Sequence, residues 1–259
     1  MTPEELHNIY KSESGFWWYR GMRAITAALL RSLPDSIHAG RAAAGLDAGC
    51  GTGFNALVLE GSRGIRMFGV DLAPLGIAYC RERGFDRSTV ASITQLPFAD
   101  SSFDLIISFD VLSHLPRADD QKALAEFARV LRPGGNLLIR VPAFHALRSR
   151  HSQFIAETHR YRSPELRKML ANIGLDVLDS TYANSFLSPV AFIKFRILED
   201  LLKAPASSGV EEIPPAWLNR VLEGILKFEA SLIRMGARFP FGQSLFVTVR
   251  KPEETGATA

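Results

Sequence analysis

Two kinds of segment alternate through the middle of this chain: short continuous apolar runs, and segments whose apolar residues recur at helical spacing. The runs predict strands, and apolar residues three or four positions apart predict helices. The expected strands lie at about 44–49, 66–71, 89–92, 103–110 and 136–141. The expected helices begin at about Phe54, Pro74 and Asp119. Strands that alternate with helices favour an α/β fold with a doubly wound parallel sheet and right-handed crossovers.

The pattern changes on both sides of this region. Before it, helical spacing predicts helices at about 3–13 and 20–33, with an aromatic stretch between them. After it, residues 142–162 are rich in Arg, His and aromatics and are typical of an active-site loop. Runs at 175–183 and 244–250 predict a closing antiparallel pair, which flanks two further helical stretches at about 189–203 and 214–236.

This pattern predicts four parts of the chain. We expect an N-terminal helical lid at 1–40 and a core formed by 41–185 and 242–251. A helical insert at 186–241 would serve as a substrate cap, and 252–259 would be a disordered tail.

Composition narrows the class of protein. A chain of 259 residues with 47% hydrophobic residues fits one large globular domain with an elaboration. The two cysteines, Cys50 and Cys80, are too few for a disulfide framework, which favours the cytoplasm, and the polar N-terminus does not resemble a signal peptide. No Cys or His spacing is typical of a metal site, and a net charge of +3 does not indicate nucleic-acid binding.

A glycine-rich loop follows the first expected strand, where Asp47 precedes Gly49, Gly51 and Gly53. Glycine allows a ligand to approach the backbone closely, and the helix that follows presents free N–H groups. The spacing differs from dinucleotide and phosphate loops, and Asp47 would repel a pyrophosphate. The loop therefore suits a nucleotide-like cofactor that carries a cationic amino-acid portion.

Residues Asp47–Gly53 resemble motif I of the class I S-adenosylmethionine-dependent methyltransferases. Three further segments are similar to motifs of that family: Gly69–Leu72, Leu96–Asp104 and Leu131–Gly135. The second of these matches the small-molecule, type 11-like branch. The resemblance implies a Rossmann-like, mostly parallel, seven-stranded sheet whose last strand is antiparallel.

The resemblance also implies S-adenosyl-L-methionine as cofactor and S-adenosyl-L-homocysteine as product. The implied cofactor contacts are Asp47, Gly49, Cys50, Gly51, Gly53, Asp71, Leu72, Ser92, Ile93, Ser108, Phe109, Tyr10, Trp18 and Arg20. Asp71 would accept hydrogen bonds from both ribose hydroxyls. Ser92 stands where the family usually has an Asp that accepts from the adenine amino group, so the carboxylate's contribution is absent.

The flanks resemble a narrower set of bacterial methyltransferases. The matching segments are Trp17–Gly21, Val141–Ala143, Ser149–His151, His159–Tyr161 and Pro240–Ser244. In related enzymes the N-terminal aromatic segment covers the cofactor. That favours a lid here, while the alternative is that these aromatics pack the N-terminal helices on the sheet.

Methyl transfer from a sulfonium is an in-line displacement, and a base helps when the nucleophile is protonated. The candidate catalytic bases are His114, His145 and His151, and the alternative for each is a structural or surface histidine. The candidate substrate-binding residues are Trp17, Tyr19, His145, His151, Arg160 and Tyr161. The arginines of this loop would grip an anionic group or form a solvated basic face.

The apolar helical insert would roof an apolar substrate pocket, form a homodimer interface or lie on a membrane surface, and we favour the roof. No run is long enough to span a bilayer. We thus expect a methyltransferase that modifies an O, N or C nucleophile of a small, anionic or apolar molecule. The alternatives are a non-methylating S-adenosylmethionine-binding protein and a methyltransferase acting on protein or nucleic acid, although Ser108–Val111 lacks the N-P-P-Y-like tetrapeptide of amino-group DNA enzymes.

Overall fold

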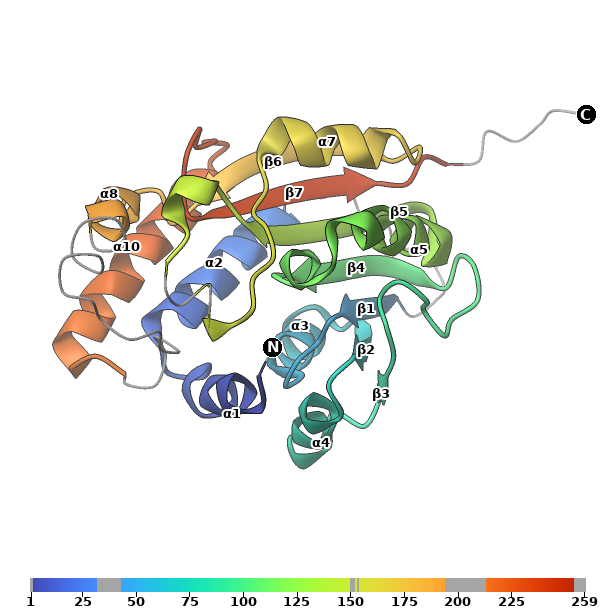
Figure 1. The fold of residues 1–259 in the computed structure, drawn as a ribbon, viewed down its shortest axis with the longest axis horizontal. Coiled ribbons are helices and arrows are strands. Elements are labelled where there is room, and N and C mark those ends of the chain that lie inside the picture. Colours follow the sequence, from blue (N-terminus) through green and yellow to red (C-terminus); the bar gives the residue numbers. More distant parts are fainter. Residues whose placement is uncertain (1, 32–42, 150–151, 153, 194–212, 254–259) are drawn as a thin grey trace, which may run out of the picture. The chain divides into compact units, whose positions relative to one another are not determined.

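The computed structural model describes residues 2–31, 43–149, 152, 154–193 and 213–253. The chain divides into two compact units, each built from three segments. Unit 1 combines Met1–Leu33, Arg140–Ser163 and Ser180–Phe246, and unit 2 combines Pro34–Ile139, Pro164–Asp179 and Val247–Ala259. Figure 1 labels their helices and strands.

Seven strands form one sheet in the order β3-β2-β1-β4-β5-β7-β6 (Figure 1). The strands are β1 (Ala44–Ala48), β2 (Arg66–Asp71), β3 (Ser88–Val90), β4 (Phe103–Phe109), β5 (Leu131–Pro142), β6 (Asp176–Ala183) and β7 (Ser244–Arg250). β1 pairs in parallel with β2 and β4, and β2 pairs in parallel with β3. β7 runs antiparallel to β5, since Gly134 N donates to Lys251 O and Lys251 N donates to Gly135 O. The predicted fold class is confirmed.

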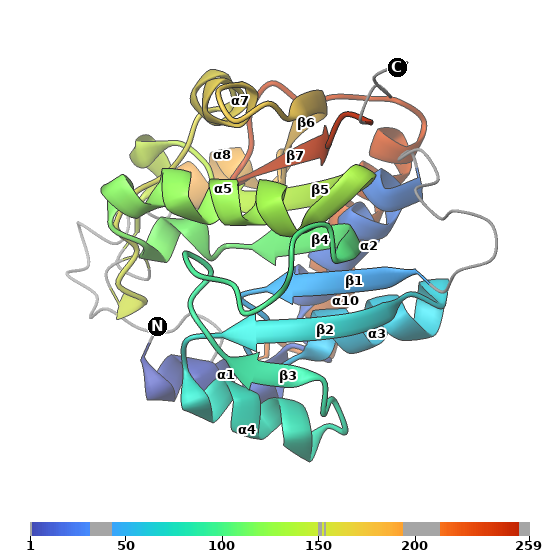
Figure 2. The same cartoon turned by 90° about the vertical axis from the view of Figure 1, so that its right-hand side faces the viewer.

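The helices of unit 2 fill the connections between its strands (Figure 2). They are α3 (Phe54–Arg63), α4 (Pro74–Glu82), α5 (Asp120–Val130) and α7 (Ser163–Ala171), with short 3-10 turns η1 (Leu112–His114) and η2 (Arg117–Asp119). α3 packs on β1 and β2, and α4 packs on β2 and β3. Lys251 Nζ donates to the carbonyls of Ala128 and Leu131 at 2.7 and 2.8 Å, which satisfies free carbonyls at the end of α5.

Unit 1 contains α1 (Pro3–Ser12), α2 (Trp17–Arg31), the turn η3 (His145–Leu147), α8 (Ser188–Ile193) and α10 (Ala216–Arg234). α2 and α10 pack together along much of their length (Figure 1). Gly21 allows this approach, because a Cβ there would lie 2.3 Å from a methyl group of Leu226. None of the helices in the described part of the chain combines the length and apolar composition that crossing a bilayer requires.

The structure differs from the sequence-based expectations at two points. α2 begins at Trp17 rather than near residue 20, because Asn219 Oδ1 accepts the Trp17 N–H at 2.9 Å. The segment Arg132–Gly135, which precedes the strand expected at about 136–141, belongs to β5, because Gly134 and Gly135 bond with Lys251. Residues 194–203 of one expected helix and residues 254–259 of the expected tail lie outside the described residues.

Candidate functional site

The glycine-rich loop connects the end of β1 to the start of α3 within unit 2. Gly49 N and Cys50 N both donate to the carbonyl of Val70, each at 2.8 Å. Gly53 N donates to Cys50 O at 2.9 Å, which closes the turn before α3 begins at Phe54. These bonds fix the loop against the end of β2, which carries Asp71.

The three glycines of the loop all have positive φ, at 91° for Gly49, 53° for Gly51 and 78° for Gly53. A Cβ on Gly49 would lie 2.2 Å from Val111, and one on Gly53 would lie 2.9 Å from Cys80 Sγ. A Cβ on Gly51 would meet nothing within 4 Å. The outer two glycines are therefore required by the protein's own packing, and Gly51 presents backbone to open space.

Asp71 ties the glycine loop to the end of β2. Its Oδ2 accepts from Gly51 N at 2.8 Å, and its Oδ1 accepts from Ala73 N at 2.9 Å. A carboxylate has roughly four acceptor positions, so each oxygen of this half-exposed side chain can accept another bond. The neighbouring Leu72 is exposed.

Cys50 lies in the loop but turns its side chain into unit 2. Its Sγ is 3.9 Å from Cys80 Sγ, and both residues are buried. The hydrogen bond with Cys80 and burial raise the pKa of the Cys50 thiol, which therefore stays neutral near pH 7. Cys50 would contact a ligand through its backbone rather than through its sulfur.

Asp47 and Ser108 lie on adjacent strands beside the loop. Asp47 is buried on β1, where it is in register with Gly69 and Ile107. Ser108 is also buried, and its Oγ donates to the carbonyl of Ala48 at 2.9 Å. This hydroxyl joins β4 to β1, and the half-buried Phe109 follows at the end of β4.

Ser92 and Ile93 follow the end of β3. Ser92 Oγ accepts from Thr94 N at 3.2 Å and lies 2.7 Å from Thr94 Oγ1, which is a hydroxyl-stabilised turn. Ile93 is buried. The contact of this turn with adenine stays a prediction.

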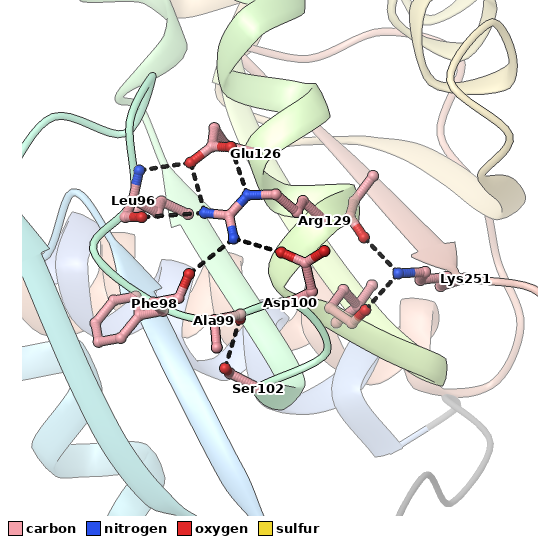
Figure 3. Close-up of polar contacts among 10 residues, drawn as sticks. Leu96, Phe98, Ala99, Asp100, Ser102, Glu126, Arg129 and Lys251 are labelled. Carbon is pink, nitrogen blue, oxygen red and sulfur yellow. Dashed lines mark hydrogen bonds and ion pairs between the residues drawn. The ribbon is translucent and has the colours of Figure 1, made fainter.

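Arg129 on α5 holds the segment that follows this turn, as Figure 3 shows. Its guanidinium donates to Leu96 O at 3.0 Å, Phe98 O at 2.8 Å and Asp100 Oδ1 at 2.8 Å. Glu126 accepts from Arg129 and from Leu96 N, and the bonds from Arg129 lower the pKa of its carboxyl. Sequence reasoning missed this pair, although the acid and the base are three positions apart on an amphipathic helix.

The three candidate bases have different surroundings. His114 is half-buried in η1, which follows β4, and it belongs to unit 2 together with the glycine loop. His145 is exposed at the start of η3 in unit 1, and His151 lies outside the described residues. No group of three His, Cys, Asp or Glu side chains in the described part of the chain is arranged to hold a metal ion.

The N-terminal aromatic residues make contacts within unit 1. The Trp18 ring lies 5.0 Å from the guanidinium carbon of Arg140 and meets the Tyr19 ring edge to face. Arg20 Nε forms an ion pair with Glu223 Oε1 at 3.1 Å. Trp17 is held through its backbone N–H, and Tyr10 is half-buried on α1. Their roles toward cofactor or substrate stay predictions.

Arg160 and Tyr161 stabilise the loop that follows β5. Arg160 donates to Glu157 Oε1 at 2.7 Å and to Ser152 Oγ at 2.9 Å. Tyr161 is fully buried, and its hydroxyl bonds to His159 Nε2 at 2.5 Å. Arg160 and Tyr161 thus have structural roles in this loop. Their contacts with a substrate stay predictions.

The chain is similar to known methyltransferases, both in a family model and in individual relatives. Residues 46–139 match the family model described as a methyltransferase domain. The chain is 26% identical to a probable tocopherol O-methyltransferase of Oryza sativa subsp. japonica, over 81% of this chain and 61% of that protein. It is 31% identical to a probable S-adenosylmethionine-dependent methyltransferase of Mycolicibacterium smegmatis, over 52% of each chain. The chain thus spans about half to three-fifths of these relatives.

Solved structures show the same fold. A geranyl diphosphate methyltransferase in complex with SAM superposes with a TM-score of 0.57 and 17% identity, over 89% of this chain and 85% of that chain. The [4+2]-cyclase SpnF superposes with a TM-score of 0.54 and 19% identity, over 89% and 80%.

Proposed function

We propose that the protein is a class I S-adenosylmethionine-dependent methyltransferase that methylates a small molecule, because residues 46–139 match the family model described as a methyltransferase domain. The accepting atom would be an O, N or C nucleophile. The observation that carries the proposal is the link between Asp71 and Gly51, because it sets a carboxylate with acceptor positions to spare beside an open stretch of backbone.

The described residues fit the cofactor. Asp71 would accept from the ribose hydroxyls, the open face of Gly51 would admit the ligand, and Asp47, buried on β1, would supply negative charge toward its cationic amino-acid portion. When bound, the cofactor supplies a methyl group on a positively charged sulfur. The protein's part is to orient the acceptor in line with that methyl group and to exclude water.

We assign the base, where the acceptor needs one, to His114. It shares unit 2 with the glycine loop, and it follows the carboxyl end of β4, the edge of a parallel sheet where ligands bind. His145 and His151 remain the other candidates. With an identified acceptor, His114→Ala should lower kcat by about 10²-fold or more while leaving cofactor affinity unchanged.

The test of the function is turnover. The full chain is incubated with S-adenosylmethionine and pools of small acceptors, a protein extract or nucleic acid, and release of S-adenosylhomocysteine is measured. Turnover only with small acceptors supports the proposal, and turnover only with a macromolecule contradicts it. Tight cofactor binding without turnover on any pool would favour the alternative of a non-methylating protein, a case that the fold shared with SpnF makes relevant.

The proposal also includes the cellular compartment of the protein, its kind of source organism and the division of the chain into four parts. Free, buried Cys50 and Cys80 support the reducing cytoplasm, which fractionation of source cells would check, and the flanking motifs support a bacterial source. The lid at 1–40, the core at 41–185 and 242–251, the cap at 186–241 and the tail at 252–259 stay as proposed parts.

The insert also supports a homodimer. Trp217, Val221 and Phe228 are exposed along α10, and the exposed Met235 directly follows the helix. Burial of this apolar surface against a second copy would favour association. Light scattering should give the dimer mass, and Val221→Glu should shift it to the monomer while Ala216→Glu, at an exposed position on another side of α10, does not. A monomer at all concentrations would contradict the dimer.

A further inference from the structure

A cavity of about 290 Å³ lies within unit 1. Its walls come from the loop after β5, from α8 and from the residues before β7. The residues that the argument uses are Phe144, Leu147, Ser188, Phe192, Phe241 and Gly242. Its volume is close to the lower end of the range for small-molecule sites, roughly 300–1,000 Å³. A part of a small molecule fits it.

The wall offers a ligand almost no polar partner. None of the lining side chains is charged, and Ser188 Oγ already donates to Asn184 O at 2.7 Å. The carbonyl of Phe241 already accepts from Ser185 Oγ at 2.6 Å. A sugar, an amino acid or a phosphate would lose its hydration here without equivalent hydrogen bonds. Hydrocarbon is the chemistry that this cavity favours.

The aromatic walls are exposed to the cavity and held in place. Phe192 is 44% exposed and Phe241 is 49% exposed, so both have apolar surface left to bury. Phe144 has a φ of 54°, an unusual value for a residue with a side chain. Its ring stacks on the ring of Tyr182, with 4.7 Å between the two ring centroids. A Cβ on Gly242 would lie 2.4 Å from Ala183 O, so glycine allows the chain beside Phe241 to lie against β6.

We propose that this cavity binds the hydrocarbon part of the methyl acceptor, so that the acceptor is a molecule with an alkyl, prenyl or aryl portion. The inference rests on the proposed function, which requires a small-molecule acceptor. A protein partner fits less well, because a stable interface buries about 1,000 Å² or more, whereas this site is concave and small.

The experiment measures binding of straight-chain alcohols, from 1-hexanol to 1-decanol, to the full chain by calorimetry. Affinity should rise about fourfold per added methylene until the cavity is full. Phe192→Asp should weaken 1-decanol binding at least tenfold, because it places a charge in the wall. Val190→Asp is the matched control on the same helix, since Val190 is 65% exposed and is not part of the wall. It should leave binding unchanged.

Affinity that does not depend on chain length would overturn the inference, and so would equal losses in the two variants. Failure of the proposed function is distinguishable from failure of the inference. Alcohol binding that follows the series without any methyl transfer contradicts the function alone. Methyl transfer to polar acceptors that Phe192→Asp does not affect contradicts the inference alone.

Discussion

Asp71 connects the end of β2 to the glycine loop, and both of its oxygens accept backbone N–H groups. A carboxylate held in this way is already oriented before a ligand arrives, so little side-chain entropy is lost on binding. The same geometry makes the loop depend on the residue, because Gly51 loses its partner when the carboxylate is removed. Binding and loop shape are thus coupled at one side chain.

Asp71→Ala should weaken binding of S-adenosylhomocysteine about hundredfold, because ribose hydroxyls and Gly51 N all lose their acceptor. Calorimetry measures the affinity, and circular dichroism checks the fold. Asp86→Ala, an exposed acid of the same unit, is the matched control and should bind normally. An unchanged affinity in Asp71→Ala would refute the assignment.

The glycines of the loop should respond differently to a methyl group. Gly49→Ala should destabilise the fold by about 2 kcal/mol or more, because its Cβ would meet Val111 at 2.2 Å. Gly51→Ala adds only the strain of positive φ, about 1 kcal/mol, but places a methyl group where the ligand approaches. Urea unfolding should therefore show a loss of stability in Gly49→Ala. Calorimetry should show mainly a loss of ligand affinity in Gly51→Ala. The reverse pattern would show that Gly51 does not face the ligand.

At the scale of elements, distant segments set the boundaries and the loops. Asn219 Oδ1 starts α2 although it is separated from Trp17 by 202 positions. Arg129 fixes residues 96–100 from another element, 29 to 33 positions away. The contacts with Trp17 N, Leu96 O and Phe98 O satisfy backbone groups that would otherwise be free at a helix start or in a loop.

Arg129→Met should destabilise the protein by about 2 kcal/mol, because three acceptors on residues 96–100 lose a charged donor. Urea unfolding measures the change. Lys122→Met on the same helix is the control, since Lys122 only pairs with Asp119 at the surface and should contribute less than about 0.5 kcal/mol. Equal effects of the two variants would mean that Arg129 does not hold the loop.

Glu229 on α10 gives unit 1 a pH dependence. It is fully buried, its Oε2 accepts from Ser185 N at 2.9 Å, and burial raises the pKa of its carboxyl above the usual 4.5. The folded carboxyl holds its proton more tightly than the unfolded one. The stability from this proton is therefore complete below the usual pKa and is lost as pH rises through the raised value.

Glu229→Gln should accordingly unfold at higher urea than the parent at about pH 8, and at about the same urea at about pH 4. The amide oxygen still accepts from Ser185 N, and no charge is left in the buried site. A gain that is the same at both pH values would show that ionisation of Glu229 is not the cause.

The positions of the central strands along the chain were predictable because buried strands leave continuous apolar runs, such as Phe103–Phe109, and family motifs mark their ends. The position of Asp71 at a strand end was predictable for the same reason. The start of α2, the strand character of Arg132–Gly135 and the clamp formed by Arg129 were not, because each depends on a partner far away in the sequence. The cavity in unit 1 also depends on three separated segments.

At the scale of the whole molecule, stability depends on contacts between the two ends of unit 1. α1 and α2 come from the N-terminus, while α10 comes from near the C-terminus. α10 buries Leu226, Ala230 and Ile233, and Leu226 lies directly against Gly21 of α2. α2 therefore protects apolar surface of α10 from water.

Removal of residues 2–33 should lower the urea midpoint and increase binding of an apolar dye such as anilinonaphthalene sulfonate, because the buried face of α10 loses its cover. Removal of residues 254–259 is the control and should change neither. A shortened chain with parental stability would show that α10 does not need α2.

The division of each unit into three chain segments has a consequence for recombination between relatives. A single crossover anywhere between Pro34 and Phe246 divides both units between the two parents, and neither unit can be expressed as one continuous fragment. Under the proposed role of the unit 1 cavity, transfer of acceptor preference from one relative to another would require exchange of Met1–Leu33, Arg140–Ser163 and Ser180–Phe246 as a set. Chimeras of this family should therefore be built as three-part grafts rather than as domain fusions.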